Sequence, residues 1–298
     1  MLSKLEFYNS THVVAESVQE HKKLRDAIAQ HYGTASVTPA QGGTLGVCFH
    51  VEVAGTRRFL KTHLPGDQMR ANLAKEAEIL RKIYGDAVVL ESVEVPLEGA
   101  AARLCLLMTE LSHLTIPMGP TQTAAMVTHY AERLQGYRPA NLQQNWDLEH
   151  YIAHGRKAIT TLRDRHLLAR QTAESLETLL TSLEDALDAL PRALCHGDLG
   201  PKNIMSSGPR FIVIDWEDAF WGVAGYDYLY WLTFMDNQPH LRHAAFGRTG
   251  IDPAIERAIL ALIVLLKSVL SVRSGAYLRN KLPIEERIAQ VLALPEAA

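Results

Sequence analysis

The sequence predicts an α+β protein with two unequal lobes, and three observations lead to this prediction. Apolar residues that alternate, as in half-buried strands, are concentrated in the first third of the chain, whereas long helical patterns dominate the remainder. The length of 298 residues exceeds the roughly 150 residues of a typical domain. The composition, with 47% hydrophobic and 21% charged residues, is that of a globular protein with a sizeable core. We expect one lobe over residues 1–110 and a second over residues 111–298.

The first lobe is expected to contain two strand pairs with a helix between them. Apolar side chains alternate from Val47 to Val53, and short turns that contain Gly55 and Gly99 connect the two strands of each pair. Asp67 caps a segment whose apolar residues recur at helical spacing. The expected elements are a strand pair at 46–53 and 58–62, a helix at 67–84, and a strand pair at 88–95 and 103–108.

The second lobe is expected to be mostly helical. Pro117, Gly119 and Pro120 mark a connection, and three or four long helical patterns follow it. Only one further strand signal interrupts these patterns, at residues 203–215. The expected helices cover about 121–135, 147–166, 170–189 and 252–272.

Charge and cysteine usage exclude several classes of protein. With 30 Lys and Arg against 33 Asp and Glu, the net charge is −3, so we expect no nucleic-acid partner and no attachment to an anionic membrane. The three cysteines form no CxxC pair, which argues against a disulfide framework or a cysteine zinc site. The most apolar stretch, 258–266, is far shorter than the roughly 18 residues that cross a bilayer. We therefore expect a cytoplasmic protein, and its oligomeric state is left open.

The residues that carry chemistry are concentrated in the segment 196–217, which contains the sequences HGDLGPKN and IVIDWE. A hairpin centred on Pro209 would place Asn203 opposite Asp215, because both lie six positions from its centre. Asp198 lies one loop away. Amide and carboxylate oxygens grouped in this way suit Mg²⁺, which binds few protein ligands together with substrate phosphates. A buried hairpin with a capped start is the alternative interpretation.

A glycine-rich segment before the first strand is a candidate phosphate-binding loop. Gly42, Gly43 and Thr44 lie in the sequence QGGTLG, directly before the strand at 46–53. Glycines allow backbone N–H groups to approach phosphate oxygens closely. The segment matches neither GxGxxG nor a P-loop, and a simple hairpin turn is the alternative. Its position before a strand pair that contains Lys61 favours phosphate binding.

A lysine and a glutamate are expected to pair in the first lobe. Lys61 shares a strand face with Phe59 and points inward, although a lone inward lysine usually extends its ammonium toward water. Glu76 lies inside the apolar stripe of the helix, whereas Lys75 and Glu78 are expected on the opposite side. A carboxylate in a core-facing stripe is costly unless it is paired. We therefore predict a Lys61–Glu76 ion pair.

These motifs give the chain a family resemblance. The HGDxxxxN spacing, the IDWE run, Lys61 and the Glu76-Ala77-x-x-Leu80 helix follow the order and spacing found in aminoglycoside phosphotransferase-like kinases. This family is a branch of the protein-kinase-like fold that includes choline and homoserine kinases. The resemblance covers most of residues 36–236. It implies a five-stranded amino-terminal lobe with one helix, a helical carboxy-terminal lobe, and ATP in the cleft between them.

The resemblance also implies roles for individual residues. Lys61, held by Glu76, would contact the α- and β-phosphates, and Asn203 and Asp215 would bind Mg²⁺. Asp198 would orient the acceptor hydroxyl and take its proton. The implied reaction is Mg²⁺-dependent transfer of the γ-phosphoryl group of ATP to a hydroxyl of a small molecule, in which the protein mainly positions the reactants and neutralises charge.

Further positions match the family or follow its motifs. Thr109 and Leu111 match the hinge, whose backbone groups would pair with the adenine edge. Glu217 and Asp218 follow the metal ligand closely and are candidates to face a cationic acceptor, with solvent exposure or helix capping as the alternative. Asp227, before an aromatic run, is expected to cap a helix.

The acceptor is expected to be a small molecule rather than a protein. The chain has Asp-Trp-Glu where protein kinases have Asp-Phe-Gly, and it has no Ala-Pro-Glu motif. Residues 222–224 read Gly-Val-Ala where Gly-Asp-Pro is common in the small-molecule family. A choline-type kinase and a nucleotide-binding pseudokinase that acts as a scaffold are the alternatives. A metal-dependent phosphatase is disfavoured, because the further His and Asp clusters that it needs are not found.

Overall fold

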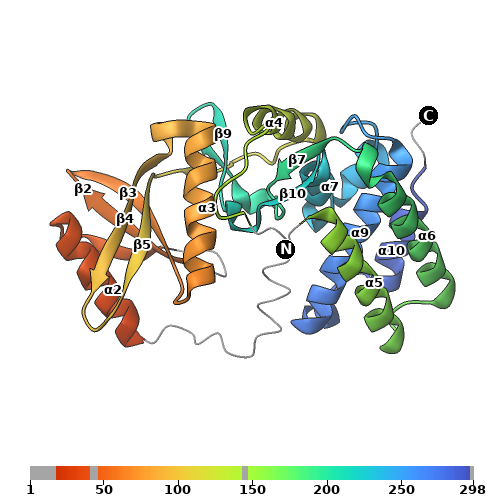
Figure 1. The fold of residues 1–298 in the computed structure, drawn as a ribbon, viewed down its shortest axis with the longest axis horizontal. Coiled ribbons are helices and arrows are strands. Elements are labelled where there is room, and N and C mark those ends of the chain that lie inside the picture. Colours follow the sequence, from red (N-terminus) through yellow and green to blue (C-terminus); the bar gives the residue numbers. More distant parts are fainter. Residues whose placement is uncertain (1–17, 41–45, 143–146, 296–298) are drawn as a thin grey trace.

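The computed structural model describes residues 18–40, 46–142 and 147–295 of the chain. Figure 1 shows a strand-rich amino-terminal part at one end and a mostly helical part at the other. The predicted α+β class, with a five-stranded sheet followed by a mostly helical part, is confirmed.

The five-stranded sheet is antiparallel throughout, with the strand order β1-β2-β3-β5-β4. Both strand pairs expected from the apolar patterns are present. The remaining strand, β1, gave no alternating pattern, because it has four residues, contains Pro39 and lies at an edge, where proline is tolerated. The strands are β1 (Val37–Ala40), β2 (Gly46–Val53), β3 (Thr56–His63), β4 (Val89–Leu97) and β5 (Ala100–Thr109).

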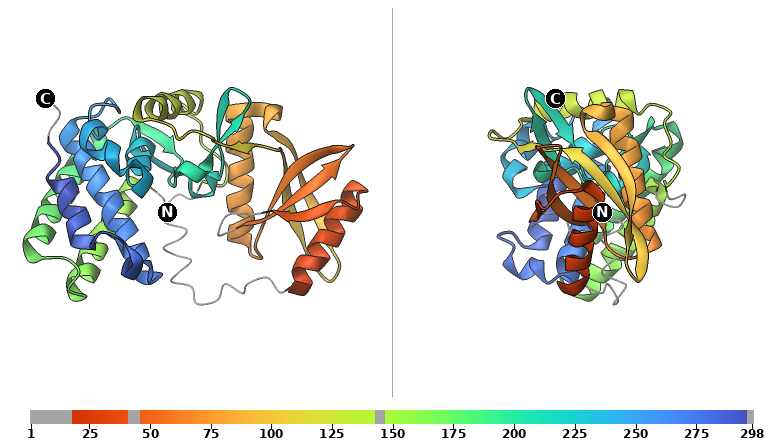
Figure 2. Two further views of the ribbon diagram at one scale, coloured as in Figure 1. Left: turned by 180° about the vertical axis from the view of Figure 1, so that it is seen from behind. Right: turned by 90° about the vertical axis from the view of Figure 1, so that its left-hand side faces the viewer.

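Two helices, and not the single helix expected, cover the two faces of this sheet: α2 (Val18–Tyr32) and α3 (Asp67–Tyr84) (Figure 2). The alternation of β5 shows the layers, because Leu104 and Leu106 pack in the core with α3, whereas Cys105 and Leu107 pack with α2. Helix α2 was not predicted because its apolar stripe is narrow and only Leu24 and Ile28 are fully buried among its described side chains. A helix that buries so few apolar residues depends on the sheet for its stability.

The four long helices expected in the second part are present, as is a short helix at Asp227, where a helix was expected to begin. Two further short helices were not expected. The central helix, α9, is buried over most of its length and contacts α5, α6 and α10. The apolar stretch at 258–266 thus forms the core of the helical part. Within the described ranges, no helix combines the length and the apolar character of a membrane span. The helices are α4 (Pro120–Arg133), α5 (Leu148–Asp164), α6 (Arg170–Ala186), α7 (Tyr226–Leu232), α8 (Gln238–Ala244), α9 (Pro253–Arg273) and α10 (Ile284–Leu292).

Short strands and single turns of 3₁₀ helix occur between the larger elements. One small sheet has the order β6-β8-β9 and the other pairs β7 with β10. The strands are β6 (Ser112–His113), β7 (Arg192–Cys195), β8 (Ile204–Ser207), β9 (Arg210–Val213) and β10 (Phe220–Val223). The 3₁₀ turns are η1 (Gly85–Ala87), η2 (Leu187–Ala189), η3 (Pro201–Asn203), η4 (Trp216–Asp218), η5 (Met235–Asn237) and η6 (Ala276–Arg279).

The register predicted for the β8–β9 hairpin is wrong by one residue. Ile204 pairs with Val213, so Asn203 lies opposite Ile214 and not opposite Asp215. The turn consists of the two residues Gly208 and Pro209, and is not centred on the proline. Gly208 has a φ of +59°, which glycine adopts without strain and which closes a tight turn. Asn203 and Asp215 still leave the hairpin at the same end.

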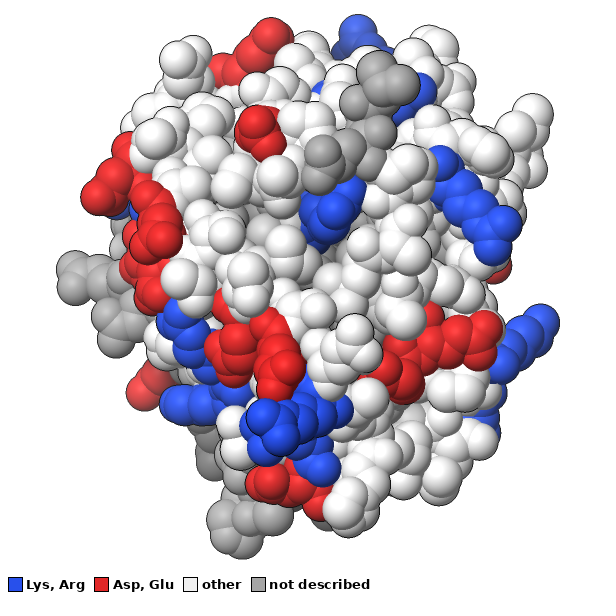
Figure 3. Space-filling model, turned by 90° about the vertical axis from the view of Figure 1, so that its right-hand side faces the viewer, with Lys and Arg blue, Asp and Glu red and all other residues white. Residues whose placement is uncertain are grey.

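Charged side chains of both signs are interspersed on the face formed by the helical part (Figure 3). Arg156 on α5, for example, lies 2.7 Å from Glu184 on α6, and Arg170 lies 2.8 Å from Glu174. Exposed pairs of this kind each contribute little to stability, about 0–1 kcal/mol. The apolar core around α9 therefore holds this part together.

Candidate active site

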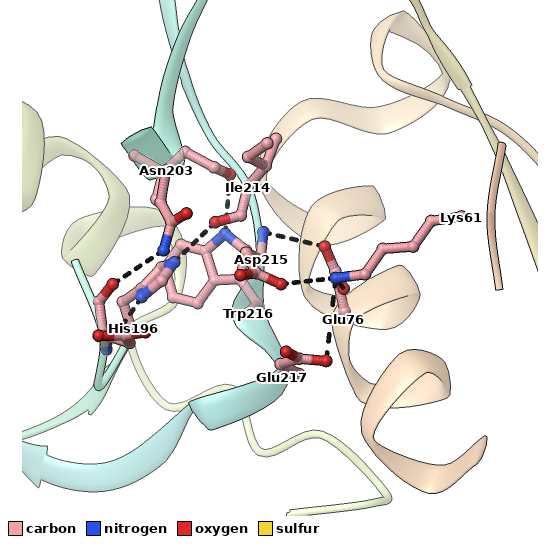
Figure 4. A network of polar contacts seen from close by, with 10 residues as sticks. Lys61, Glu76, His196, Asn203, Ile214, Asp215, Trp216 and Glu217 are labelled. Carbon is pink, nitrogen blue, oxygen red and sulfur yellow. Dashed lines mark hydrogen bonds and ion pairs between the residues drawn. The ribbon is translucent and has the colours of Figure 1, made fainter. Parts of the chain in front are cut away.

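A buried lysine lies among three carboxylates where the sheet meets the helical part (Figure 4). Lys61 Nζ, on β3, is 2.7 Å from Oε2 of Glu76 on α3 and 2.5 Å from Oδ1 of Asp215. Oε2 of Glu217 lies 3.9 Å away. The predicted Lys61–Glu76 pair is therefore present. Burial lowers the pKa of Lys61, but Asp215, Glu76 and Glu217 outweigh it and hold the pKa well above its ordinary value, so the ammonium stays charged.

Glu76 holds Lys61 and the segment after β9 at the same time. Its side chain is 1% exposed and emerges from the apolar stripe of α3. While Oε2 contacts Lys61, Oε1 accepts a hydrogen bond from the backbone N–H of Asp215 at 2.9 Å. Asp215 has left-handed backbone angles, with φ at 70°, which are uncommon for a residue other than glycine. Such strain persists where the surroundings fix it, as Glu76 and Lys61 do here.

Lys75 is not on the outer side of α3, so the orientation predicted for it is wrong. Its side chain is fully buried and its Nζ donates to the backbone carbonyl of Ala219 at 3.2 Å. The reason is that η4 covers the side of α3 that lies away from the sheet. Burial lowers the pKa of Lys75 to about 8, against the opposing attraction of Asp218, Glu217 and Glu76.

The two candidates for the acceptor side, Glu217 and Asp218, are both buried. Glu217 is 6% exposed and faces Lys61, and Asp218 is 1% exposed and acts electrostatically on Lys75. Burial, which outweighs the attraction of Lys61, raises the pKa of Glu217 to about 8. Neither side chain is presented on an open surface.

Three of these carboxylates form a cluster of oxygen atoms that could hold a metal ion. One oxygen each of Glu76, Asp215 and Glu217 lies within 4.8 Å of the other two. Hard oxygen ligands of this type suit Mg²⁺. Glu217 was not predicted to belong to this cluster, although its position two residues after Asp215 indicates that both side chains can reach the same site.

The loop that carries Asp198 is tied to the β8–β9 hairpin. Nδ2 of Asn203 donates to the backbone carbonyl of Asp198 at 2.9 Å, and the carbonyl of Asn203 accepts from the N–H of Ile214 at 3.0 Å. Oδ1 of Asp198 accepts a hydrogen bond from the hydroxyl of Tyr230 on α7. Asp198 and Asn203 are thus brought together, and the hairpin joins them to the segment that carries Asp215.

Asp227 orders the loop that carries Asp198 and is not the helix cap that was expected. Gly225 precedes the first turn of α7, and Asp227 lies inside the helix. Its carboxylate accepts from the backbone N–H groups of His196 at 2.7 Å and Gly197 at 3.0 Å. A third bond comes from the hydroxyl of Tyr130 at 2.7 Å. Three donors converge on one buried carboxylate, so Asp227 orders the backbone directly before Asp198.

His196 links the two segments of the site through its ring. Nδ1 accepts from the backbone N–H of Asp198 at 3.2 Å, so Nε2 carries the proton and donates to the carbonyl of Ile214 at 2.8 Å. The ring also packs against Trp216, with the centroids 4.8 Å apart. Both ring nitrogens are occupied, so His196 positions the loop.

Comparison with known proteins agrees with this geometry. Residues 36–259, about three quarters of the chain, match the model of the phosphotransferase enzyme family. The chain belongs to this family. The predicted resemblance and the predicted enzyme class, a phosphotransferase with an alcohol group as acceptor, are confirmed. No curated protein sequence shows significant similarity to this phosphotransferase.

Solved structures share the fold of the phosphotransferase at low sequence identity. A thermostable mutant of the aminoglycoside phosphotransferase APH(4)-Ia, in complex with ADP and hygromycin B, has a TM-score of 0.61 and 14% identity, covering 93% of this chain and 100% of that one. A choline/ethanolamine kinase family protein from Mesorhizobium loti has a TM-score of 0.57 and 19% identity, covering 93% and 95%. Spectinomycin phosphotransferase APH(9)-Ia, with ADP and spectinomycin, has a TM-score of 0.55 and 14% identity, covering 93% and 98%.

The remaining predicted site residues of the phosphotransferase lie in its amino-terminal part. Thr109, at the end of β5, donates from its backbone N–H to the carbonyl of Val88 at 3.0 Å, so this amide is engaged within the protein. Leu111 is partly buried against the main core. The glycine-rich segment with Gly42, Gly43 and Thr44 lies outside the described residues. The nucleotide contacts of these positions therefore stay predictions.

Gly197→Ala is expected to destabilise the phosphotransferase by about 2–4 kcal/mol and to reduce its activity. Gly197 has a φ of +82°, which already costs a residue with a Cβ about 1 kcal/mol. A Cβ there would lie 2.3 Å from the backbone carbonyl oxygen of Asp218, a rigid neighbour that must shift and typically adds 1–3 kcal/mol. Chemical denaturation measures the effect.

Gly208→Ala is the matched control for this prediction. Gly208 also has a positive φ, of +59°, but a Cβ at this position would meet no atom within 4 Å. We expect a loss of only about 1 kcal/mol from the backbone conformation. Equal losses in the two variants would show that the close approach to Asp218 has no energetic importance.

Proposed function

We propose that this phosphotransferase transfers the γ-phosphoryl group of ATP, with Mg²⁺, to a hydroxyl of a small molecule. The observation that carries the proposal is the buried Lys61, held charged by Glu76 and Asp215 at 2.7 and 2.5 Å, next to the loop that presents Asp198. Burying a charged cluster is costly unless its charges are paired. An ATP·Mg²⁺ complex carries negative phosphates and a positive ion. It is therefore complementary to a site that contains an ammonium group and carboxylates.

The amino-terminal part is proposed to bind the nucleotide. The ammonium of Lys61 would contact the α- and β-phosphates, and Glu76 would keep it in position when the phosphates are absent. Gly42, Gly43 and Thr44 would approach the phosphates, while the carbonyl of Thr109 and the backbone of Leu111 would contact the adenine edge. The aminoglycoside and spectinomycin phosphotransferase structures of this fold that contain ADP or AMP-PNP support a nucleotide as the donor.

Asn203 and Asp215 are proposed to hold Mg²⁺, and the donor chemistry fits. The oxygen cluster of Asp215, Glu76 and Glu217 offers hard ligands, and the side chain of Asp215 is 20% exposed. When bound, Mg²⁺ supplies positive charge to the β- and γ-phosphate oxygens. Glu217, two residues after Asp215, is a further ligand in this proposal.

Asp198 is proposed to orient the acceptor hydroxyl and to take its proton. The hydroxyl of Tyr230 donates a hydrogen bond to Oδ1 of Asp198, and Nδ2 of Asn203 donates one to the backbone carbonyl of Asp198. These two bonds hold the carboxylate in one orientation. A loose transition state releases the hydroxyl proton late, so a carboxylate of ordinary basicity is sufficient. Positioning and proton transfer are then the main contributions of this loop.

The acceptor is proposed to be a small molecule, and the structures of the same fold that contain hygromycin B or spectinomycin support this class.

We also propose that residues 1–110 and 111–298 form two separate lobes, and that the protein works in the cytoplasm. Three buried free thiols, Cys48, Cys105 and Cys195, are typical of a reducing compartment.

Turnover of ATP with a panel of acceptors tests this function. Purified protein, ATP and Mg²⁺ are incubated with aminoglycosides, choline, homoserine or sugars, and ADP release is measured together with the mass of each acceptor. We expect one acceptor class to gain a single phosphoryl group in proportion to the ADP released. Tight binding of ATP without transfer to any acceptor would favour the alternative of a nucleotide-binding scaffold. Phosphate release from simple monoesters would indicate a phosphatase.

A further inference from the structure

A cavity that contains none of the residues around Lys61 is lined by residues of α3, α4 and the β8–β9 hairpin. Its volume is about 650 Å³, which is in the range of small-molecule sites. Tyr84, Tyr130 and Ile212 line it, and Tyr130 and Ile212 are nearly fully buried. Phe211 at its edge is 39% exposed, which is unusual for a large apolar side chain in this protein. The cavity therefore offers a mostly apolar wall that includes aromatic rings.

The charged side chains that line this cavity are two arginines, which lie beside the neutral polar side chains of Gln122 and Ser207. Arg133 at the end of α4, Arg210 on β9 and His129 on α4 contribute to its lining, and no aspartate or glutamate does so within the described residues. Neither arginine forms an ion pair in the part of the chain that the structure describes. Burial raises the pKa of Tyr84 to about 12, and the hydrogen bond with Val213 and the charge of Arg133 oppose this shift. Both arginines are exposed to solvent. Two guanidinium groups next to aromatic rings suit an anion with an apolar body.

Two side chains of the cavity wall are hydrogen-bonded to segments of the active site. The hydroxyl of Tyr84 accepts from the backbone N–H of Val213 at 2.8 Å, two residues before Asp215. The hydroxyl of Tyr130 donates to Asp227, which orders the loop of Asp198. A ligand in the cavity would thus contact residues that are one hydrogen bond away from the catalytic segments.

We propose that this cavity is a second ligand site, which binds a small organic anion: a carboxylate or phosphate group held by Arg133 and Arg210, on an aromatic or alkyl body that packs against Tyr84 and Phe211. The site shares no residue with the proposed nucleotide site. Its occupancy therefore does not depend on whether the protein is a kinase.

Phenyl phosphate and benzoate are suitable probes, and benzyl alcohol and benzylamine are the neutral and cationic analogues. Isothermal titration calorimetry with the full-length protein should give one-to-one binding of an anionic probe. We expect at least tenfold weaker binding of the two analogues. Because phenyl phosphate could also enter the nucleotide site, the titration is repeated with saturating ADP and Mg²⁺, and the affinity should change less than twofold. Loss of all binding in the presence of ADP would overturn the proposal.

Two kinds of variant locate the site. Arg133→Gln combined with Arg210→Gln removes the positive charges, and Ala125→Trp fills the cavity from an exposed position of α4 without changing charge. Each is expected to weaken anion binding at least tenfold, whereas Arg165→Gln, at an exposed arginine outside the cavity, should leave the affinity unchanged. Wild-type affinity in the double arginine variant and in the tryptophan variant would refute the site. Circular dichroism confirms that each variant is folded.

Discussion

Asp198→Asn is expected to lower the rate of phosphoryl transfer by about 10²–10⁴-fold, the range that general base catalysis typically contributes. An asparagine has the same shape, and its carbonyl oxygen can still accept the hydrogen bond from Tyr230. The hydrogen bond from Nδ2 of Asn203 to the backbone carbonyl of residue 198 is also retained. The variant therefore keeps the loop but loses the group that takes the proton. Steady-state turnover with the acceptor found in the panel measures the effect.

The melting temperature and a second variant show whether this loss is specific. Asp185→Asn, at an exposed aspartate of α6, makes the same chemical change outside the proposed site and should leave turnover within twofold of the wild type. Asp198→Asn should unfold within a few degrees of the wild-type protein. Undiminished turnover in Asp198→Asn would remove Asp198 from its proposed role.

Lys61→Met is expected to lower the free energy of unfolding by about 3–5 kcal/mol in the absence of divalent cations, the range for breaking a buried ion pair from one side. The methionine fills much of the volume of the lysine but leaves Glu76, Asp215 and Glu217 without their cation. Partial protonation of the carboxylates reduces this cost, so we expect a value at the lower end. Urea denaturation at neutral pH measures it.

Divalent cations provide a specific test of the same variant. Because the three carboxylates lose their cation, Mg²⁺ should stabilise Lys61→Met more than it stabilises the wild-type protein. ATP turnover should fall by at least tenfold, because the contact to the phosphates is lost. Lys157→Met, at an exposed lysine of α5, is the matched control and should change stability by less than 1 kcal/mol. Equal stability of Lys61→Met and wild type without Mg²⁺ would contradict the importance of the cluster.

The sequence was sufficient to predict those parts of the site that depend on local pattern. The position of Glu76 inside an apolar stripe indicated that it needs a cation, and Lys61 is that cation in the structure. The alternation of strands and the long helical patterns predicted most of the larger elements. Periodicity is informative in these cases because one covered face leaves a regular trace in the sequence.

The predictions failed where a contact depends on segments far apart in the chain. Lys75 was placed outside because the stripe argument assumes one covered face, whereas α3 is covered by the sheet and by η4. Asp227 was interpreted as a cap, although its partners are the N–H groups of a loop about thirty residues earlier. The burial of Asp218 likewise follows from its proximity to α3. No local pattern specifies such contacts.

A crystal structure of the protein with a non-hydrolysable ATP analogue and Mg²⁺ tests the central claim most directly. It should show the ion bound by side-chain oxygens of Asn203 and Asp215, the ammonium of Lys61 within hydrogen-bond distance of the α- or β-phosphate, and the carboxylate of Asp198 facing the γ-phosphate from the acceptor side. A nucleotide bound elsewhere, or a Lys61 still enclosed by its carboxylates with the phosphates out of reach, would contradict it.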